Sequence, residues 1–240
     1  HPAEDHTLIE GWIQHDVAID LFRRAGLDFA ALKKTAQTRD FKAVELKGAG
    51  FSADYAVSSQ VITSHNVVGR VEGAKRPNET VIYSAHWDHL GIGAPDARGD
   101  RINNGAVDNA TGTAALIEMG RAFANGKRPD RSVVFLAVTA EEKGLLGSEY
   151  YAANPLYPLA TTVAVLNMDA LSPWGPTRDF SISGSAKLDL LDRLIGDAKA
   201  WKRTYTPDSK PEAGLFFRSD HFPFAKRGVP TLLLMGMGGG

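Results

Sequence analysis

The sequence contains no cysteine, and this absence limits the chemistry that the protein can perform. It excludes disulfide bonds, thiol nucleophiles and every metal or iron–sulfur site built on cysteine ligands. A metal ion bound by this chain would therefore need histidine, aspartate or glutamate side chains as its ligands.

The chain also lacks an excess of one charge and any long apolar run. Its 27 Lys and Arg residues nearly balance its 28 Asp and Glu residues, so no basic surplus is available to hold a nucleic-acid backbone. No apolar run approaches the ~20 residues of a membrane-spanning helix. We therefore expect neither a nucleic acid nor a membrane as a partner. The 240 residues, 43% of them hydrophobic, suffice for one large or two small globular domains.

Both ends of the sequence favour a piece of a longer protein. Residues 1–5 lack the basic start and the apolar stretch of a signal peptide. Glycine and methionine alternate after Met235, a pattern that is typical of a turn leading into a further element. We therefore expect the natural chain to continue beyond Gly240.

Hydrophobic spacing predicts two helices near the start of the chain, followed by strands. The first helix should run from Leu8 to about Gly26, and the second from its N-cap Asp28 to Lys34. Short alternating segments between residues 41 and 71, such as residues 43–46 and 66–71, predict antiparallel strands. The apolar face of the first helix would consist of Ile9, Ile13, Val17 and Leu21.

Four unbroken apolar runs after Pro77 suit strands that are buried on both faces of a sheet. Two segments whose apolar residues have the spacing of a helix lie between these runs. The first ends at Gly126 and the second before Trp201. Strands that alternate with helices predict an α/β fold with a mixed, mostly parallel central sheet and helices on both faces. The four runs are residues 80–85, 132–139, 162–168 and 229–235.

Imidazole and carboxylate side chains follow three of these runs, and one more carboxylate precedes a helix. In a parallel sheet the ligand site lies beyond the carboxyl ends of the strands, so these side chains should meet at one edge. The residues are His86 and Asp88 after the first run, Glu141 and Glu142 after the second, Asp169 after the third, and Asp108 before the helix.

His86, Asp88 and Asp108 each allow a functional and a structural interpretation. His86 and Asp88 point the same way on an extended segment, so His86 could bind a metal ion while Asp88 fixes the tautomer of its ring. The alternative is a polar loop at the end of a strand. Asp108 has small neighbours that would let its carboxylate bridge two ions. Alternatively, Asp108 stabilises the start of the next helix by capping.

Three further carboxylates require a cation or another partner. Glu141 and Glu142 repel each other unless a cation lies nearby. If Glu142 binds a metal ion, Glu141 is free to act as a general base toward a water that the metal makes acidic. The alternative is a solvated acidic pair. Asp169 follows an apolar strand, where a lone charge is expensive to bury, and either a metal ion or Arg178 could be its partner.

A later polar cluster, Ser219 to His221, is expected beside the site. Ser219 or Asp220 would cap a short helix, and His221 would lie near the ligands without binding. His89 could contact a metal ligand without binding the metal ion itself. A site of carboxylates with one histidine per ion suits zinc, or alternatively manganese or cobalt.

The order and spacing of these motifs resemble those of the co-catalytic zinc aminopeptidases, metallopeptidase family twenty-eight. Aminopeptidase Y and glutamate carboxypeptidase II belong to this family. The resemblance runs from about Asn66 to Pro230 and implies the zinc exopeptidase fold, of phosphorylase/hydrolase type, and a peptide substrate. The matching motifs are residues 84–89, 107–112, 139–148 and 167–169.

The resemblance implies two zinc ions that share one carboxylate. In the family the second histidine ligand comes from a loop after the strand matched here by residues 229–234, so this chain is expected to lack it. Only His221, beside Asp220, could then fill that place. The implied roles are His86 and Asp169 on one ion, Glu142 on the other, Asp108 on both, Glu141 as catalytic base and Asp88 as the residue that orients His86.

The resemblance also implies a domain organisation and an activity. Residues 1–40 would be a helical linker at the tail of a protease-associated insert, and residues 41–240 a zinc exopeptidase domain without its C-terminal part. The expected activity is hydrolysis of the N-terminal residue from a peptide. The alternatives are a glutaminyl cyclase or carboxypeptidase of the same fold, or a receptor-like ectodomain without catalysis. Relatives are often exported, which favours an extracellular or periplasmic location; the oligomeric state is not predicted.

Overall fold

The computed structural model divides into two units, one ending at Val61 and the other beginning at Ile62. This division lies further along the chain than the boundary expected after residue 40. Several residues in the predicted elements, including Leu8 and the glycine-rich residues 236–240, lie outside the described residues. The structure describes residues 9, 11–58, 60–173, 175, 177–184 and 188–235.

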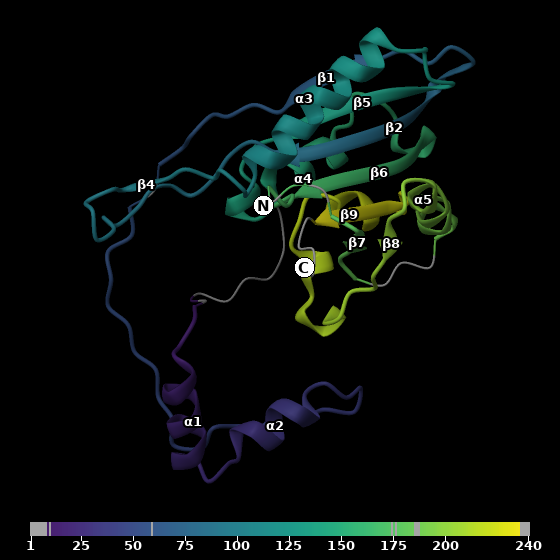
Figure 1. Cartoon of the computed structure of the whole chain (residues 1–240). Helices are drawn as coiled ribbons and strands as arrows, with labels where there is room; N and C mark the ends of the chain where they lie inside the picture. Colours follow the sequence, from purple (N-terminus) through teal and green to yellow (C-terminus); the bar gives the residue numbers. More distant parts are fainter. Residues whose placement is uncertain are drawn as a thin grey trace. The chain divides into compact units, whose positions relative to one another are not determined.

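The first unit contains the helices α1 (His15–Arg24) and α2 (Phe29–Thr35) (Figure 1). Asp28 caps α2 as predicted, because its carboxylate accepts a hydrogen bond from the N–H of Ala31 at 3.0 Å. The predicted start of α1 is wrong, since Ile9 and residues 11–14 are not helical. Spacing alone does not form a helix unless its apolar face is packed, and this face is largely exposed.

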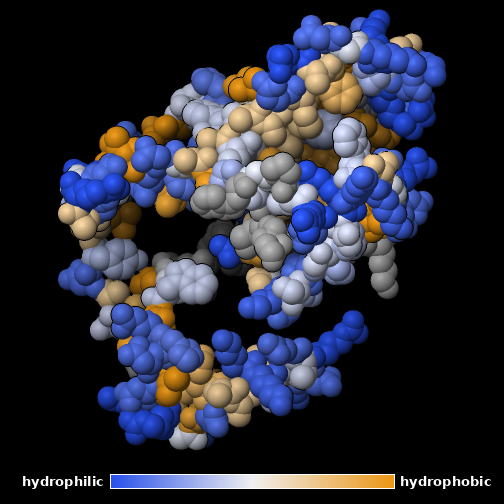
Figure 2. Space-filling model, in the orientation of Figure 1, coloured by the Kyte–Doolittle hydropathy of each residue, from blue (hydrophilic) through white to orange (hydrophobic). Residues whose placement is uncertain are grey.

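The strand predicted at residues 43–46 is also wrong, because the described residues between 41 and 61 form no strand. They pair with no neighbouring strand that could satisfy their main-chain groups in a sheet. Apolar side chains of this segment remain exposed, among them Phe51 and Val61, and Figure 2 shows apolar residues on the outside of this unit.

In the second unit the described residues form a seven-stranded sheet with the order β1-β5-β2-β6-β9-β7-β8. Its four central strands are the predicted apolar runs, and neighbouring central strands are parallel. The fold class predicted from the sequence is confirmed. These strands are β5 (Arg131–Val138), β2 (Arg76–His86), β6 (Thr162–Asp169) and β9 (Thr231–Met235).

Short edge strands flank this parallel centre and make the sheet mixed. On one side β1 (Val67–Val71) runs antiparallel to β5. On the other side β7 (Asp179–Ile182) is antiparallel to β9, and β8 (Thr204–Tyr205) is parallel to β7. A separate hairpin joins β3 (Gly91–Ile92) and β4 (Ile102–Asn103).

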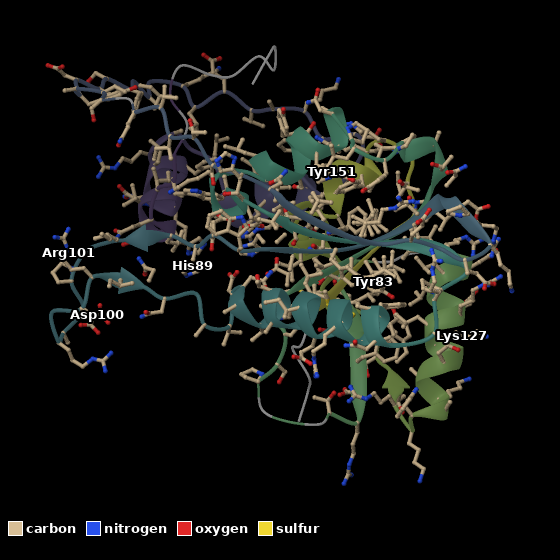
Figure 3. All side chains as sticks on the ribbon, turned by 90° about the horizontal axis from the view of Figure 1, so that it is seen from above. Tyr83, His89, Asp100, Arg101, Lys127 and Tyr151 are labelled. Carbon is tan, nitrogen blue, oxygen red and sulfur yellow. The ribbon has the colours of Figure 1, made fainter. Side chains whose placement is uncertain are left out.

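Helices cover both faces of the sheet because successive strand residues point to opposite sides. Tyr83 of β2 packs with Phe123 of α3 on one face, whereas Ile82 packs with Tyr151 of α4 on the other. Figure 3 shows Tyr83 and Tyr151 on opposite sides of the strands. The helices of this unit are α3 (Ala110–Asn125), α4 (Leu146–Ala153), α5 (Asp189–Ala200) and α6 (Phe222–Ala225). The short 3-10 turns are η1 (Glu141–Lys143), η2 (Leu159–Thr161), η3 (Pro211–Ala213) and η4 (Leu215–Phe217).

Three hydrogen bonds among Asn66, Thr139 and Gly147 fix the turn that follows β5. The N–H of Gly147 donates to the Thr139 carbonyl at 2.9 Å, and the Asn66 side chain bonds both residues, at 2.8 and 3.1 Å. A Cβ on Gly147 would overlap the Thr139 oxygen and lie 2.6 Å from Oδ1 of Asn66. Only glycine therefore fits at position 147. The three hydrogen bonds in turn fix the segment that carries Glu141 and Glu142.

We therefore expect Gly147→Ala to lower the free energy of unfolding by about 1–3 kcal/mol, a cost typical of overpacking. Gly196→Ala in α5 is the matched control, because a Cβ on Gly196 would meet open space. The control should be neutral or stabilising by up to about 1 kcal/mol. Thermal unfolding measures both variants, and equal midpoints for the two would contradict this role of Gly147.

Candidate metal centre

The carboxyl ends of the central strands bring the predicted ligands to one edge of the sheet. His86 and Asp169 are the last residues of the neighbouring strands β2 and β6. Glu142 lies in η1, directly after β5, and Asp108 precedes α3. This placement follows from the parallel arrangement, in which strand ends of equal direction meet at the same edge.

One ligand group consists of His86, Asp108 and Asp169. Nε2 of His86 lies 3.0 Å from Oδ1 of Asp108 and 3.3 Å from Oδ1 of Asp169. The His86 side chain is almost fully buried, whereas half of the Asp108 side chain is exposed. Solvent therefore reaches this group of ligands at the side chain of Asp108.

A second group consists of His89, Asp108 and Glu142. Nδ1 of His89 lies 2.6 Å from Oε1 of Glu142. In each group the candidate ligand atoms lie within 4.8 Å of one another. Asp108 belongs to both groups. Glu141 belongs to neither.

The unpaired atoms of these groups fit a divalent cation. Oδ1 of Asp108, Nδ1 of His89 and Oε1 of Glu142 are buried, and none has a hydrogen-bond partner among the described residues. They lie close to other polar atoms but do not point at them as hydrogen bonds require. Buried polar atoms without a partner are costly, and a shared cation would satisfy all three. Imidazole with carboxylates is a ligand set that zinc accepts.

Residues 66–239 match the family model described as peptidase family M28. The chain belongs to peptidase family M28. The resemblance inferred from the motifs is confirmed. No helix among the described residues of this M28 chain has the length and apolar character needed to cross a membrane.

Two curated relatives illustrate the similarity. The M28 chain is 32% identical over 179 residues to the protein named aminopeptidase NAALADL1 of Mus musculus, covering 64% of this chain and 21% of that relative. It is 28% identical over 195 residues to leupeptin-inactivating enzyme 1 of Streptomyces exfoliatus, covering 80% and 40%. The chain thus spans only about a fifth to two fifths of the length of these relatives.

Solved structures share the fold. An aminopeptidase from Aneurinibacillus sp. strain AM-1 superposes with a TM-score of 0.56 at 24% identity, over 72% of this chain and 39% of that one. A glutaminyl cyclase from Porphyromonas gingivalis gives a TM-score of 0.55 at 20% identity, over 71% and 62%. At these identities the likeness establishes the architecture of the M28 chain and not its reaction.

Asp88 contacts the M28 site differently from the prediction. Nδ1 of His86 lies 3.0 Å from the main-chain carbonyl of Asp88, whereas the Asp88 carboxylate is 3.8 Å away. The carboxylate instead accepts the N–H groups of Glu141 at 3.1 Å and Glu142 at 3.4 Å. Asp88 therefore joins the end of β2 to the turn after β5, which the sequence did not reveal.

Two structural alternatives are wrong, namely capping of α3 by Asp108 and the pairing of Asp169 with an arginine. Asn109, and not Asp108, caps α3, because its Oδ1 accepts the N–H of Gly112 at 3.0 Å. Asp169 contacts His86 and accepts a hydrogen bond from Oγ of Ser219 at 2.6 Å, so the alternative partner Arg178 is not the one that it uses. Both carboxylates thus remain available to a cation.

The expected helix cap at Ser219 or Asp220 is also wrong, since α6 has no side-chain cap. Both side chains are buried and are used elsewhere: Ser219 bonds Asp169, and Oγ of Ser148 donates to Asp220 at 2.6 Å. His221 packs edge-on against Phe216 at 4.7 Å between ring centroids. It belongs to neither ligand group, so the structure does not place it as the missing ligand.

The carboxylates give this edge a surplus of negative charge. Burial raises the pKa of Glu141 to about 8, and the Asp220 carboxylate adds to this rise. Burial lowers the pKa of His86, but Asp169 and further carboxylates outweigh it and raise this pKa to about 10. Both shifts favour protonation, which is the response of a site that needs positive charge.

Zinc should therefore stabilise the folded chain. At a hundredfold excess over its dissociation constant, a ligand of the folded state adds about 2.7 kcal/mol. For a chain of this size that corresponds to a rise of roughly 5–11 °C in the unfolding midpoint. His86→Ala should reduce the rise, and His65→Ala, on the exposed surface, should not. Calorimetry with and without zinc checks this, and an unchanged wild-type midpoint would contradict a metal site.

The buried carboxyl group of Asp220 should make the stability of the metal-free chain depend on pH. Burial raises its pKa to about 7, so the folded chain keeps this proton up to about pH 7 while the unfolded chain releases it near pH 4. The contribution to stability is complete below about pH 4 and is lost as the pH rises to about 7. Asp220→Asn cannot release this proton, and its loss of stability over that range should be smaller.

Unfolding midpoints of the chelator-treated chain between pH 4 and pH 7 measure this difference. The Asp220→Asn variant should still lose some stability over this pH range, because the raised pKa of Glu141 acts in the same direction. Asp197→Asn on the exposed face of α5 is the control and should keep the wild-type slope. Equal slopes for Asp220→Asn and wild type would show that Asp220 is ionised in the folded chain.

Proposed function

We propose that this chain carries the catalytic centre of a zinc aminopeptidase, which hydrolyses the first peptide bond of its substrate. The observation that supports it best is the pair of ligand groups that share Asp108, with Glu141 beside them and outside both. Membership of family M28 and a relative named aminopeptidase agree with this reaction.

The site is proposed to hold two zinc ions. His86, Asp108 and Asp169 would bind one, and Asp108 with Glu142 would bind the other. When bound, zinc supplies Lewis acidity, which polarises a carbonyl group and makes water a stronger acid. Asp108 would contribute to both ions, because its carboxylate belongs to both ligand groups.

Glu141 is proposed as the general base. Its carboxylate would take a proton from the attacking water and return it to the nitrogen of the leaving amine. A raised pKa, near neutral pH, suits a group that must both accept and donate a proton. Asp88 acts as a positioning residue, because its carboxylate holds the main-chain N–H groups of Glu141 and Glu142.

The relative that covers 64% of this chain is named an aminopeptidase, and this name favours removal of N-terminal residues over removal of C-terminal ones. The glutaminyl cyclases share the fold alone and add no argument for cyclisation.

Glu141→Gln tests the proposal directly, because the amide cannot accept the proton. We expect kcat for an aminoacyl-p-nitroanilide to fall by ~10²–10⁴-fold while the zinc content stays unchanged. Glu118→Gln, on the exposed side of α3, is the control and should keep the wild-type rate. Turnover that survives in Glu141→Gln would remove this residue as the base.

The substrate class is tested with three peptides. The wild-type chain should cleave the aminoacyl-p-nitroanilide and leave an N-acetylated dipeptide intact, because acetylation removes the positive amine. Cleavage of the blocked dipeptide would favour a carboxypeptidase instead. Ring closure of an N-terminal glutaminyl peptide without hydrolysis would favour a cyclase.

A further inference from the structure

We propose that Asn109 is a positioning residue for the first metal ion, because its side chain holds Asp108 and Asp169 at a fixed separation. The inference rests on the proposed function, since it needs the ion that these two carboxylates and His86 would bind. It gives the buried amide a second task besides the cap of α3.

The Asn109 side chain joins two segments that lie far apart in the sequence. Its Oδ1 accepts the N–H of Gly112 at 3.0 Å, which is the cap of α3. Its Nδ2 donates to the main-chain oxygen of Met168 at 2.9 Å, and Oδ1 also accepts the N–H of Ala170 at 3.3 Å. Met168 and Ala170 are the two neighbours of Asp169 in the chain. One amide therefore holds the main chain on both sides of this ligand.

The same amide ties Asp169 to Asp108, because Asn109 directly follows Asp108 in the chain. Both carboxylates approach Nε2 of His86, with Oδ1 of Asp108 at 3.0 Å and Oδ1 of Asp169 at 3.3 Å. Metal–ligand distances in proteins vary by only about 0.2 Å, so small shifts of the main chain at either ligand weaken binding. Asn109 is 2% exposed, and water therefore has little access to its hydrogen bonds.

Capping of the helix does not by itself explain an asparagine at this position. A cap needs only an acceptor oxygen, and serine or aspartate provides one equally well. The Nδ2 group, which donates to Met168, distinguishes asparagine from these residues. The bond to the end of β6 is therefore the part of the contact that requires the amide.

Gly112 provides an independent observation, because it lets the start of α3 approach the end of β6. A Cβ at this position would overlap Oδ1 of Asn109 and lie 2.7 Å from the main-chain oxygen of Met168. It would also lie 3.0 Å from Cβ of Ala85 in β2. A side chain here would push the amide away from the carbonyl that it bonds.

Asn109→Ser separates the two tasks of the side chain. Serine can cap α3, but its shorter side chain carries no amide and cannot reach Met168 at the same time. The start of α3 stays joined to the turn after β6, since the N–H of Leu171 donates to Oγ1 of Thr111 at 3.0 Å. Asn125→Ser is the matched control, because its amide bonds only a carbonyl of its own helix on the exposed surface.

Metal affinity and a spectrum of the bound ion test the proposal without an activity assay. Competition with a chromophoric chelator should show that Asn109→Ser binds one zinc ion ~10–100-fold more weakly, as the loss of a contact behind a ligand does. Asn125→Ser should keep the wild-type affinity. In a titration with Co²⁺, the visible absorption bands should differ between Asn109→Ser and wild type, because they report the geometry of the ligands. A general loss of stability would not change these bands.

Gly112→Ala completes the test. It keeps Asn109 and every ligand but displaces the amide, so it should weaken the same ion by ~10–100-fold. Should Asn109→Ser not fold, Asn109→Thr, which also caps a helix and carries no amide, replaces it, with the same outcomes.

The outcomes separate this inference from the proposed function. Wild-type affinity together with an unchanged cobalt spectrum in Asn109→Ser would overturn the role of Asn109 and leave the metal site in place. A wild-type chain that binds neither zinc nor cobalt would overturn the proposed function, and this inference with it.

Discussion

Repulsion among carboxylates is the constraint on which the whole site depends. Asp108, Asp169, Glu141 and Glu142 meet at one edge of the sheet, with a fifth carboxylate, Asp220, buried behind them. Such a group is stable only if protons or cations offset its charge. Without metal, the raised pKa values of Glu141 and His86 favour protons in this role. Cations would release those protons and leave Glu141 able to accept one during a reaction.

The fold holds the carboxylates in place through neutral contacts. Ser84 donates to Asn167 at 2.7 Å, Asn167 donates to Ser219 at 2.7 Å, and Ser219 donates to Asp169 at 2.6 Å. This buried chain of hydrogen bonds crosses from β2 to β6 and orients one carboxylate without neutralising it. Asp88 performs the corresponding task for the turn after β5. These hydrogen bonds orient Asp169 and the turn that carries Glu141 and Glu142, and they leave the negative charge available to ions.

Local sequence patterns predicted the segments whose own apolar composition decides their burial, although these strands pair with partners far away in the sequence. The apolar runs of β2, β5, β6 and β9 carry mostly buried or half-buried residues on both faces of the sheet. Their pattern was therefore enough to predict the fold and the edge where the ligands meet. The carboxylate of Asp88 could not be assigned, because its partners depend on the left-handed turn at Ala140. The place of His89 depends in the same way on a left-handed turn at Gly105, where a Cβ would lie 2.9 Å from Cβ of His89. The strand expected at residues 43–46 failed because no neighbour pairs with it.

Anomalous X-ray diffraction at the zinc absorption edge, from crystals of the zinc-loaded chain, tests the central claim most directly. The account predicts two peaks about 3.5–4 Å apart, both within about 2.2 Å of Asp108 oxygens. A map without peaks at this edge, with the carboxylates turned toward solvent or toward arginine and lysine side chains, would contradict it.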